Sequence, residues 1–114
     1  MTIKVCLDTD ADPAVTVHPK HKDKNKGKDT ITWKPDKGQA FTFVSLKFDT
    51  TPNPFGKIHV KDHKITVDDD DIGASSVGSF PYTIVVEYKG NTYDTIKRDA
   101  TGEIMGPVIH NKPG

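Results

Sequence analysis

The stretch FPYTIVVEYKGNTYD, residues 80–94, decides the fold class of this chain. Its first nine residues alternate, with Tyr82, Ile84 and Val86 on one side. A period of two is the side-chain period of a β-strand, and β-branched and aromatic residues favour that conformation. The following KGN, residues 89–91, is typical of a tight hairpin turn. The stretch therefore predicts a β-hairpin with one strongly apolar strand.

Short alternating segments of the same kind recur along the whole chain, about ten residues apart. None shows apolar residues at helical spacing over three turns, so no helix is expected. Nine glycines and eight prolines in 114 residues indicate frequent turns. We therefore predict an all-β fold, an antiparallel Greek-key β-sandwich of seven to nine short strands, with one domain spanning residues 1–114. The strand segments are residues 3–7, 14–18, 29–35, 39–48, 57–60, 63–69, 80–88, 91–95 and 106–110.

Two aromatic segments allow finer predictions. Along residues 39–48 the apolar side chains switch faces, because Phe43 and Leu46 fall on opposite sides of a regular strand. That change of phase predicts a β-bulge or bend near residues 44–45. The single tryptophan, Trp33, is expected to pack between the two sheets.

The overall charge argues against several broad functions. Sixteen Lys and Arg balance sixteen Asp and Glu, so the formal net charge is zero. General nucleic-acid and membrane binders usually carry a basic excess, so neither partner is expected unless a local patch supplies that excess.

Residues 1–13 lack the apolar core of a signal peptide, and no apolar run approaches about 18 residues, which favours a cytoplasmic location. The lone Cys6 allows neither an intrachain disulfide nor a zinc site built from several cysteines.

Four motifs occur in order along the chain: DPAVTV (12–17), ITWKPDKGQAFTF (31–43), GSFPYTIVVEYKGNTYD (78–94) and GPVIHNKP (106–113). In this order they resemble the small, stand-alone bacterial proteins of the cupredoxin-like or immunoglobulin-like β-sandwich type. The resemblance covers nearly the whole chain and implies a fold of that kind.

Cupredoxins also bind copper, through two His, a Cys and a weak axial ligand. Where the resemblance places the first His, this chain reads GQAFTF (38–43). Where it places the Cys, this chain has Val86, and the loop that follows contains neither His nor Met. Cys6 lies at the other end of the chain. We therefore expect no copper site and no cofactor.

A first aspartate cluster is a candidate cation site. Asp8, Asp10 and Asp12 stand at alternate positions, as at the start of an EF-hand loop. Pro13 and Pro19, however, occupy the positions at which that loop needs Gly and Glu. Two interpretations stay open: a calcium site of another kind, and a turn in which Asp side chains accept backbone N–H groups.

A second cluster, VDDDDIG (67–73), contains four adjacent carboxylates, which repel one another. A cation or the basic tract would relieve that repulsion, and the other interpretation is a solvated loop. Serines follow it, among them Ser79, but they lack the G-x-S-x-G elbow of hydrolases. The four carboxylates are Asp68, Asp69, Asp70 and Asp71.

Two histidine pairs, His18 with His21 and His59 with His63, have spacings found in metal sites. On a straight strand, residues four apart face the same way but lie about 13 Å apart, too far for one metal ion. A turn would bring His59 and His63 closer. Surface histidines are the preferred interpretation.

The tract KHKDKNKGK, residues 20–28, has lysine at every second position, so an extended chain would direct all five to one side. It could be a solvated loop or protective edge, a surface for a protein partner, or a site for nucleic-acid phosphate or lipid headgroups. It contains no aromatic residue, which argues against single-strand binding. The candidate partner-binding residues are Lys20, Lys22, Lys24, Lys26 and Lys28.

The chain shows no catalytic triad, no metal site of known spacing and no phosphate loop. We therefore expect a non-enzymatic interaction or structural module that acts through loops or edge strands, with a protein partner or self-association. The oppositely charged tracts also suggest head-to-tail self-association as a hypothesis. The alternative function is a calcium-binding protein that uses the two aspartate clusters.

Overall fold

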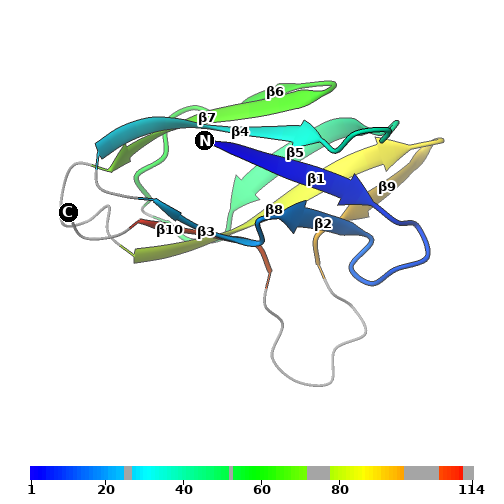
Figure 1. The fold of residues 1–114 in the computed structure, drawn as a ribbon, viewed down its shortest axis with the longest axis horizontal. Helices are drawn as coiled ribbons and strands as arrows, with labels where there is room; N and C mark the ends of the chain where they lie inside the picture. The colour runs from blue at the N-terminus through cyan, green and yellow to red at the C-terminus, as the bar shows by residue number, and fades with distance from the viewer. Residues whose placement is uncertain (25–26, 52, 72–77, 97–105, 112–114) are drawn as a thin grey trace.

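The computed structural model of the chain consists of two β-sheets packed face to face (Figure 1). It describes residues 1–24, 27–51, 53–71, 78–96 and 106–111. This part of the chain contains ten strands and no helix. The all-β sandwich predicted from the alternating pattern is confirmed.

The first sheet has the strand order β2-β1-β4-β7-β6. Its edges are therefore β2 and β6, and β4 lies at its centre. The strands are β1 (Thr2–Leu7), β2 (Val15–His18), β4 (Gly27–Pro35), β6 (His59–Lys61) and β7 (Lys64–Asp71).

The second sheet has the strand order β3-β10-β8-β5, and β9 also pairs with β8. Because β8 is eleven residues long, its first part pairs with β10 and its last part with β9. The strands are β3 (His21–Lys24), β5 (Thr42–Phe48), β8 (Gly78–Tyr88), β9 (Asn91–Asp94) and β10 (Val108–Asn111).

Two pairings correct the expectation of antiparallel sheets. β1 runs parallel to β4, and β10 runs parallel to β3. The cause is the path of the chain: after β2 it enters the second sheet as β3 and returns to the first as β4, so β1 and β4 are not joined by a hairpin. Residues of the lysine tract belong to both strands: its first half forms β3, a strand that the sequence pattern did not predict, and Lys28 lies near the start of β4.

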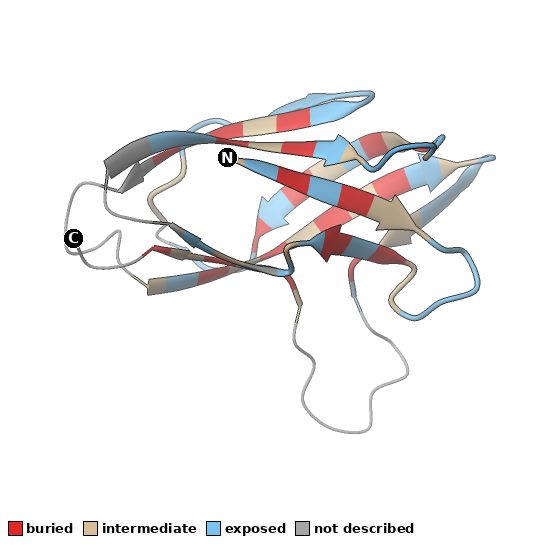
Figure 2. Ribbon diagram, in the orientation of Figure 1, coloured by how far each residue is buried: buried red, intermediate tan, exposed pale blue. Residues whose placement is uncertain are grey.

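The core lies between the sheets and follows the alternation of the strands (Figure 2). Trp33 is fully buried at its centre, as predicted. Its indole Nε1–H donates a hydrogen bond to the Tyr82 hydroxyl at 3.1 Å, and the two rings meet edge to face with centroids 5.3 Å apart. The pair joins β4 of one sheet to β8 of the other, so it satisfies the polar atoms of both aromatic side chains within the core.

The predicted bulge is confirmed in β5, where the pairing with β8 shifts between Phe43 and Ser45. Val44 is the extra residue and its side chain is exposed, whereas Phe43 and Leu46 are both buried. At the bulge, the Phe43 N–H donates to the Asp62 carbonyl oxygen of the β6–β7 turn at 2.8 Å. The bulge therefore keeps the apolar residues inside and links the two sheets along one edge.

The predicted hairpin turn after β8 is also confirmed. Lys89 and Gly90 have φ angles of 50° and 80°, and they connect β8 directly to β9. Positive φ at both central residues is what a two-residue hairpin turn of type I′ requires. Tyr88, the last residue of β8, is thereby placed at one end of the sandwich.

Candidate binding pocket

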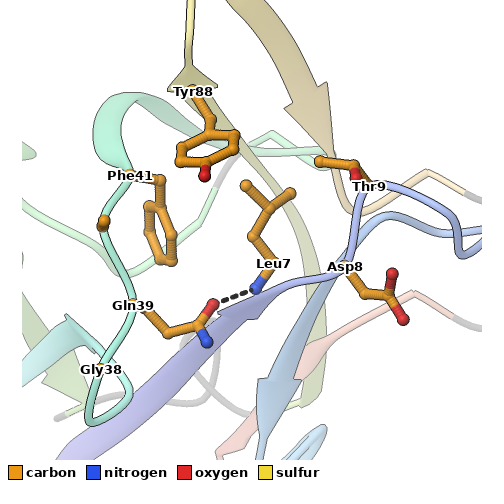
Figure 3. Close-up of a pocket in the computed structure, with 8 residues that line it drawn as sticks. Leu7, Asp8, Thr9, Gly38, Gln39, Phe41 and Tyr88 are labelled. Atoms are coloured by element: carbon orange, nitrogen blue, oxygen red, sulfur yellow. Dashed lines mark hydrogen bonds between the residues drawn. The ribbon is translucent and has the colours of Figure 1, made fainter.

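A pocket of about 450 Å³ lies at the end of the sandwich where β1 finishes (Figure 3). Its volume is within the range of small-ligand and side-chain sites. Both sheets contribute to it: β1 and the loop after it, the β4–β5 connection, and the end of β8. The lining residues are Leu7, Asp8, Thr9, Gly38, Gln39, Ala40, Phe41 and Tyr88.

Three side chains with apolar surfaces lie at the base of the pocket, and two of them are partly exposed. Phe41 is fully buried and packs edge to face against Phe43, with ring centroids 5.5 Å apart. Leu7 and Tyr88 are half-buried and pack against the core. In Figure 3 the side chains of Phe41, Leu7 and Tyr88 surround one space, toward which the Tyr88 hydroxyl points.

A side-chain hydrogen bond holds the wall of the pocket in place. The Leu7 backbone N–H donates to Gln39 Oε1 at 2.8 Å, which attaches the β4–β5 connection to the end of β1 (Figure 3). The same connection turns at Gly38, whose φ of 83° is a conformation that residues with a Cβ rarely adopt. The Gln39 N–H also donates to the Asp36 carbonyl oxygen at 3.1 Å. The wall is therefore preformed.

The polar rim comes from the loop between β1 and β2. Asp8 Oδ1 accepts the Asp10 N–H at 3.0 Å, and the Asp8 carbonyl accepts the Ala11 N–H at 3.1 Å. The predicted turn, in which an Asp side chain accepts a backbone N–H, is therefore confirmed at Asp8. Asp8 and Thr9 are exposed at the pocket rim.

A lysine lies against the aromatic ring of the same pocket. Lys89 Nζ is 5.2 Å from the centroid of the Tyr88 ring. This is within the distance at which the ring quadrupole attracts an ammonium group.

The second aspartate cluster is not a loop, so the solvated-loop interpretation is wrong. Asp68–Asp71 belong to β7 and pair with Gly27–Thr30 of β4. Asp68 is exposed and accepts the Thr30 hydroxyl at 2.8 Å. Asp69 is fully buried, and its Oδ1 accepts Asn111 Nδ2 at 3.0 Å. Strand pairing and the Asn111 amide thus provide hydrogen bonds that a solvated loop would take from water.

The lysine tract is divided between the two sheets. Lys20 precedes β3, which contains Lys22 and Lys24, whereas Lys28 lies in β4 opposite Asp70; Lys26 lies outside the described residues. In β3, Lys22 stands in parallel register with Ile109 and is half-buried. The basic tract and the second aspartate cluster therefore occupy neighbouring strands, at the end of the molecule far from the pocket.

The two aspartate clusters lie at opposite ends of the first sheet, because Asp8 follows β1 whereas Asp68–Asp71 face the start of the parallel β4. Within the described residues, no three His, Cys, Asp or Glu side chains are grouped so as to hold a metal ion. Calcium binding stays a prediction. His18, His59 and His63 are exposed.

One polar group was not found by sequence reasoning. Ser79 Oγ and His110 Nδ1 lie 2.8 Å apart, and Asp23 stands beside His110 in the strand register. The three residues come from β8, β10 and β3, so no local motif could reveal them. None of them lines the described pocket, or a second cavity of about 430 Å³ near Thr95 and Pro107.

Cys6 is held as a thiol. Its Sγ donates to Asp36 Oδ2 at 3.3 Å. Burial, followed by the Asp36 hydrogen bond and negative charge, raises the pKa of Cys6 above the ordinary thiol value. The Lys37 backbone N–H, followed by the Cys6 thiol, lowers the pKa of Asp36. Since the thiolate is the nucleophile, this environment disfavours cysteine catalysis.

No family model matches the chain, and no curated protein matches its sequence. Across the described part of the chain, there is no helix of sufficient length and apolarity to cross a membrane.

Proposed function

We propose that the protein is a non-enzymatic binding module that engages a protein partner through the pocket at the Leu7 end of the sandwich. The observation that carries the proposal is the pocket itself: a buried aromatic floor beside an exposed polar rim on loops. Loops that a rigid sheet scaffold positions are common binding sites. A cytoplasmic location, as expected from the sequence, is part of the proposal.

Preorganisation supports this function. The Leu7–Gln39 hydrogen bond and the turn at Asp8 fix the wall and the rim, and Phe41 belongs to the core. A pocket whose walls are already ordered loses little conformational entropy when it binds. Binding at this site therefore needs no rearrangement of the sheets.

The described polar groups support binding more than catalysis. The Ser79–His110 pair lies outside the described cavities, and acyl transfer needs a substrate site and oxyanion donors as well as a nucleophile and a base. The raised pKa of Cys6 disfavours a thiolate nucleophile.

The test is a set of ¹H–¹⁵N correlation spectra during titration with capped amino-acid amides that cover aromatic, aliphatic, basic and acidic side chains. We expect at least one class to shift the amides of Leu7, Thr9, Gln39 and Tyr88, with dissociation constants of about 1–10 mM, as is usual for single side chains. Tyr88→Ala should abolish these shifts. The proposal would be refuted if no probe shifts the pocket amides. It would also be refuted if Tyr88→Ala leaves the shifts unchanged.

A further inference from the structure

We infer that the outer face of the first sheet binds the phosphate backbone of double-stranded nucleic acid through a row of lysines that crosses four strands. The inference goes beyond the proposed function, because none of these lysines lines the pocket. It is carried by the strand register, the residue types on the face and the positions of nearby carboxylates. The lysine row consists of Lys4, Lys34, Lys64 and Lys61.

The register of the first sheet brings the four lysines side by side. Lys4 of β1 stands opposite Lys34 of β4, and Lys64 of β7 stands opposite Lys61 of β6. Continuing the β4–β7 pairing by one residue beyond Trp33 places Lys34 opposite Lys64. The row therefore crosses β1, β4, β7 and β6 in their order within the sheet (Figure 1). Neighbouring strands lie about 4.8 Å apart, so three steps give a row about 15 Å long.

All four side chains are on the solvent side of the sheet. They are exposed and alternate along their strands with core residues such as Ile3, Trp33 and Ile65. His18 of the edge strand β2 stands opposite Lys4 and extends the row by one more strand. Like charges directly opposite each other destabilise a sheet. The row therefore costs stability in the isolated protein, and an anion that binds along it would relieve the repulsion.

A second row of hydrogen-bonding side chains lies beside the lysines on the same face. Thr2, Thr32 and Thr66 stand in register on β1, β4 and β7, two residues from the lysines, and His59 of β6 pairs with Thr66. Lysine and threonine are usual contacts to phosphate oxygens. Protein–protein interfaces are instead depleted in lysine and enriched in aromatic residues and arginine. Neither row contains Phe, Tyr or Trp on which single-strand bases could stack, so a duplex backbone is favoured.

Carboxylates around the row limit the shape of the anion. Asp36 directly follows β4, Asp62 lies in the turn that joins β6 to β7, and Asp68 lies farther along β7. All three are exposed. A flat anionic membrane would bring headgroups against these carboxylates as well, whereas a phosphate backbone can follow the lysines. The row is thus a local basic patch in a chain whose formal net charge is zero.

The experiment measures the binding of short, fluorescently labelled DNA and RNA duplexes by anisotropy, at low salt and over a salt series. We expect binding at low salt whose logarithmic constant falls with the logarithm of salt concentration at a slope of about −3 to −4, because four phosphate contacts release counterions. A duplex of unrelated sequence should bind equally well, since backbone contacts carry no sequence information.

The main variant combines Lys4→Gln, Lys34→Gln and Lys64→Gln. It should bind the duplexes at least about tenfold more weakly at low salt, with a slope reduced to about −1. Its melting temperature should not fall, because the substitutions remove like charges that stand opposite each other. Lost binding can then be distinguished from lost folding.

The matched control makes the same change in net charge in or next to the second sheet. It should bind the duplexes as the wild-type protein does. The control changes three exposed lysines to Gln: Lys20, Lys47 and Lys89.

The inference is overturned if neither duplex binds at low salt, or if the control variant loses as much affinity as the main variant. Tighter binding of the matching single strand, of a poly-glutamate peptide or of phosphatidylserine vesicles would also overturn it, because the row would then serve another class of anion. The amide-shift titration of the pocket uses none of these probes, so each of these outcomes leaves the proposed function standing.

Discussion

At the scale of single residues, Asp69 differs from its neighbours in the aspartate run. It is fully buried, and its Oδ1 accepts the Asn111 amide across the two sheets. Burial of a carboxylate is tolerated only when hydrogen bonds replace water. Asp69 therefore helps to join β7 to β10 at the end of the sandwich where the apolar core stops.

We expect Asp69→Ala to lower the free energy of unfolding by about 1.5–3 kcal/mol, the usual range for a hydrogen bond to a charged group. Urea denaturation followed by Trp33 fluorescence measures the loss. Asp68→Ala is the control, because Asp68 is exposed on the same strand, and it should cost at most about 1 kcal/mol. Equal losses for the two variants would show that the burial of Asp69 has no energetic consequence.

Cys6 provides a prediction with a defined dependence on pH. Because the pKa of the thiol is raised, less thiolate is present at any given pH, so alkylation by iodoacetamide should reach its half-maximal rate above the pH of an ordinary cysteine. Asp36→Asn removes the negative charge beside the thiol. The midpoint of the rate against pH should therefore move down, and the rate at mildly alkaline pH should rise.

The distant Asp49→Asn should leave the alkylation profile of Cys6 unchanged. If Asp36→Asn also leaves it unchanged, the contact between Cys6 and Asp36 does not control the thiol, and burial is the only cause of its raised pKa.

At the scale of elements, three edge strands are unsuited to pairing with another chain. β3 contains lysines, β5 has the bulge at Val44, and β6 is only three residues long. Charged residues, bulges and short strands are the usual means of protecting an edge. This arrangement favours the interpretation of the β3 lysines as a protective edge.

The β8–β9 turn offers a prediction at the same scale. Gly90 has a φ of 80° and open space around its Cα, so the backbone conformation is the only obstacle to a side chain. Gly90→Ala should cost about 1–2 kcal/mol, the penalty for a left-handed conformation with a Cβ. Thermal or urea unfolding measures it.

Gly56→Ala is the matched control for that experiment. Gly56 does not have a positive φ, and an added Cβ would make ordinary contacts with Asp68, the nearest at 3.7 Å. The substitution should change stability by less than about 1 kcal/mol. A Gly90→Ala variant as stable as the wild type would contradict the assigned turn.

At the scale of the whole molecule, the fold places opposite charges on neighbouring strands. Lys28 of β4 stands opposite Asp70 of β7, so part of the basic tract lies beside the second aspartate cluster within one chain. Charges that are neutralised by neighbouring charges of the same chain attract a second copy of the protein less strongly. This arrangement weakens the case for head-to-tail self-association through the second aspartate cluster, whereas the first cluster still lies at the end opposite the basic tract.

We therefore expect the wild-type protein to sediment as a monomer at low and at high salt. Replacing Lys20, Lys22, Lys24, Lys26 and Lys28 by Gln should make association increase with concentration, because the β3 edge loses its charges. Changing the same number of lysines elsewhere, at Lys34, Lys37, Lys47, Lys57 and Lys61, is the control. Wild-type association at low salt that high salt reverses would instead support the head-to-tail hypothesis.

The sequence by itself determined the features that depend on neighbours along the chain. Alternation predicted every described strand except β3, the phase change at Phe43 and Leu46 predicted the bulge, and Lys89-Gly90 predicted the tight turn. Trp33 could be assigned to the core because its strand alternates. These features follow from the period of two in an extended chain, which is a local property.

Only the tertiary structure decided which strands pair and which side chains meet. The alternation of Asp68 and Asp69 across β7 did not reveal that the inward position would meet Asn111, 42 residues away. The pocket likewise joins Leu7, Gln39 and Tyr88 from three distant segments, and Ser79 meets His110 only through strand pairing. The physical reason is that alternation states which face a side chain occupies, whereas the partner across that face depends on the packing of the whole chain.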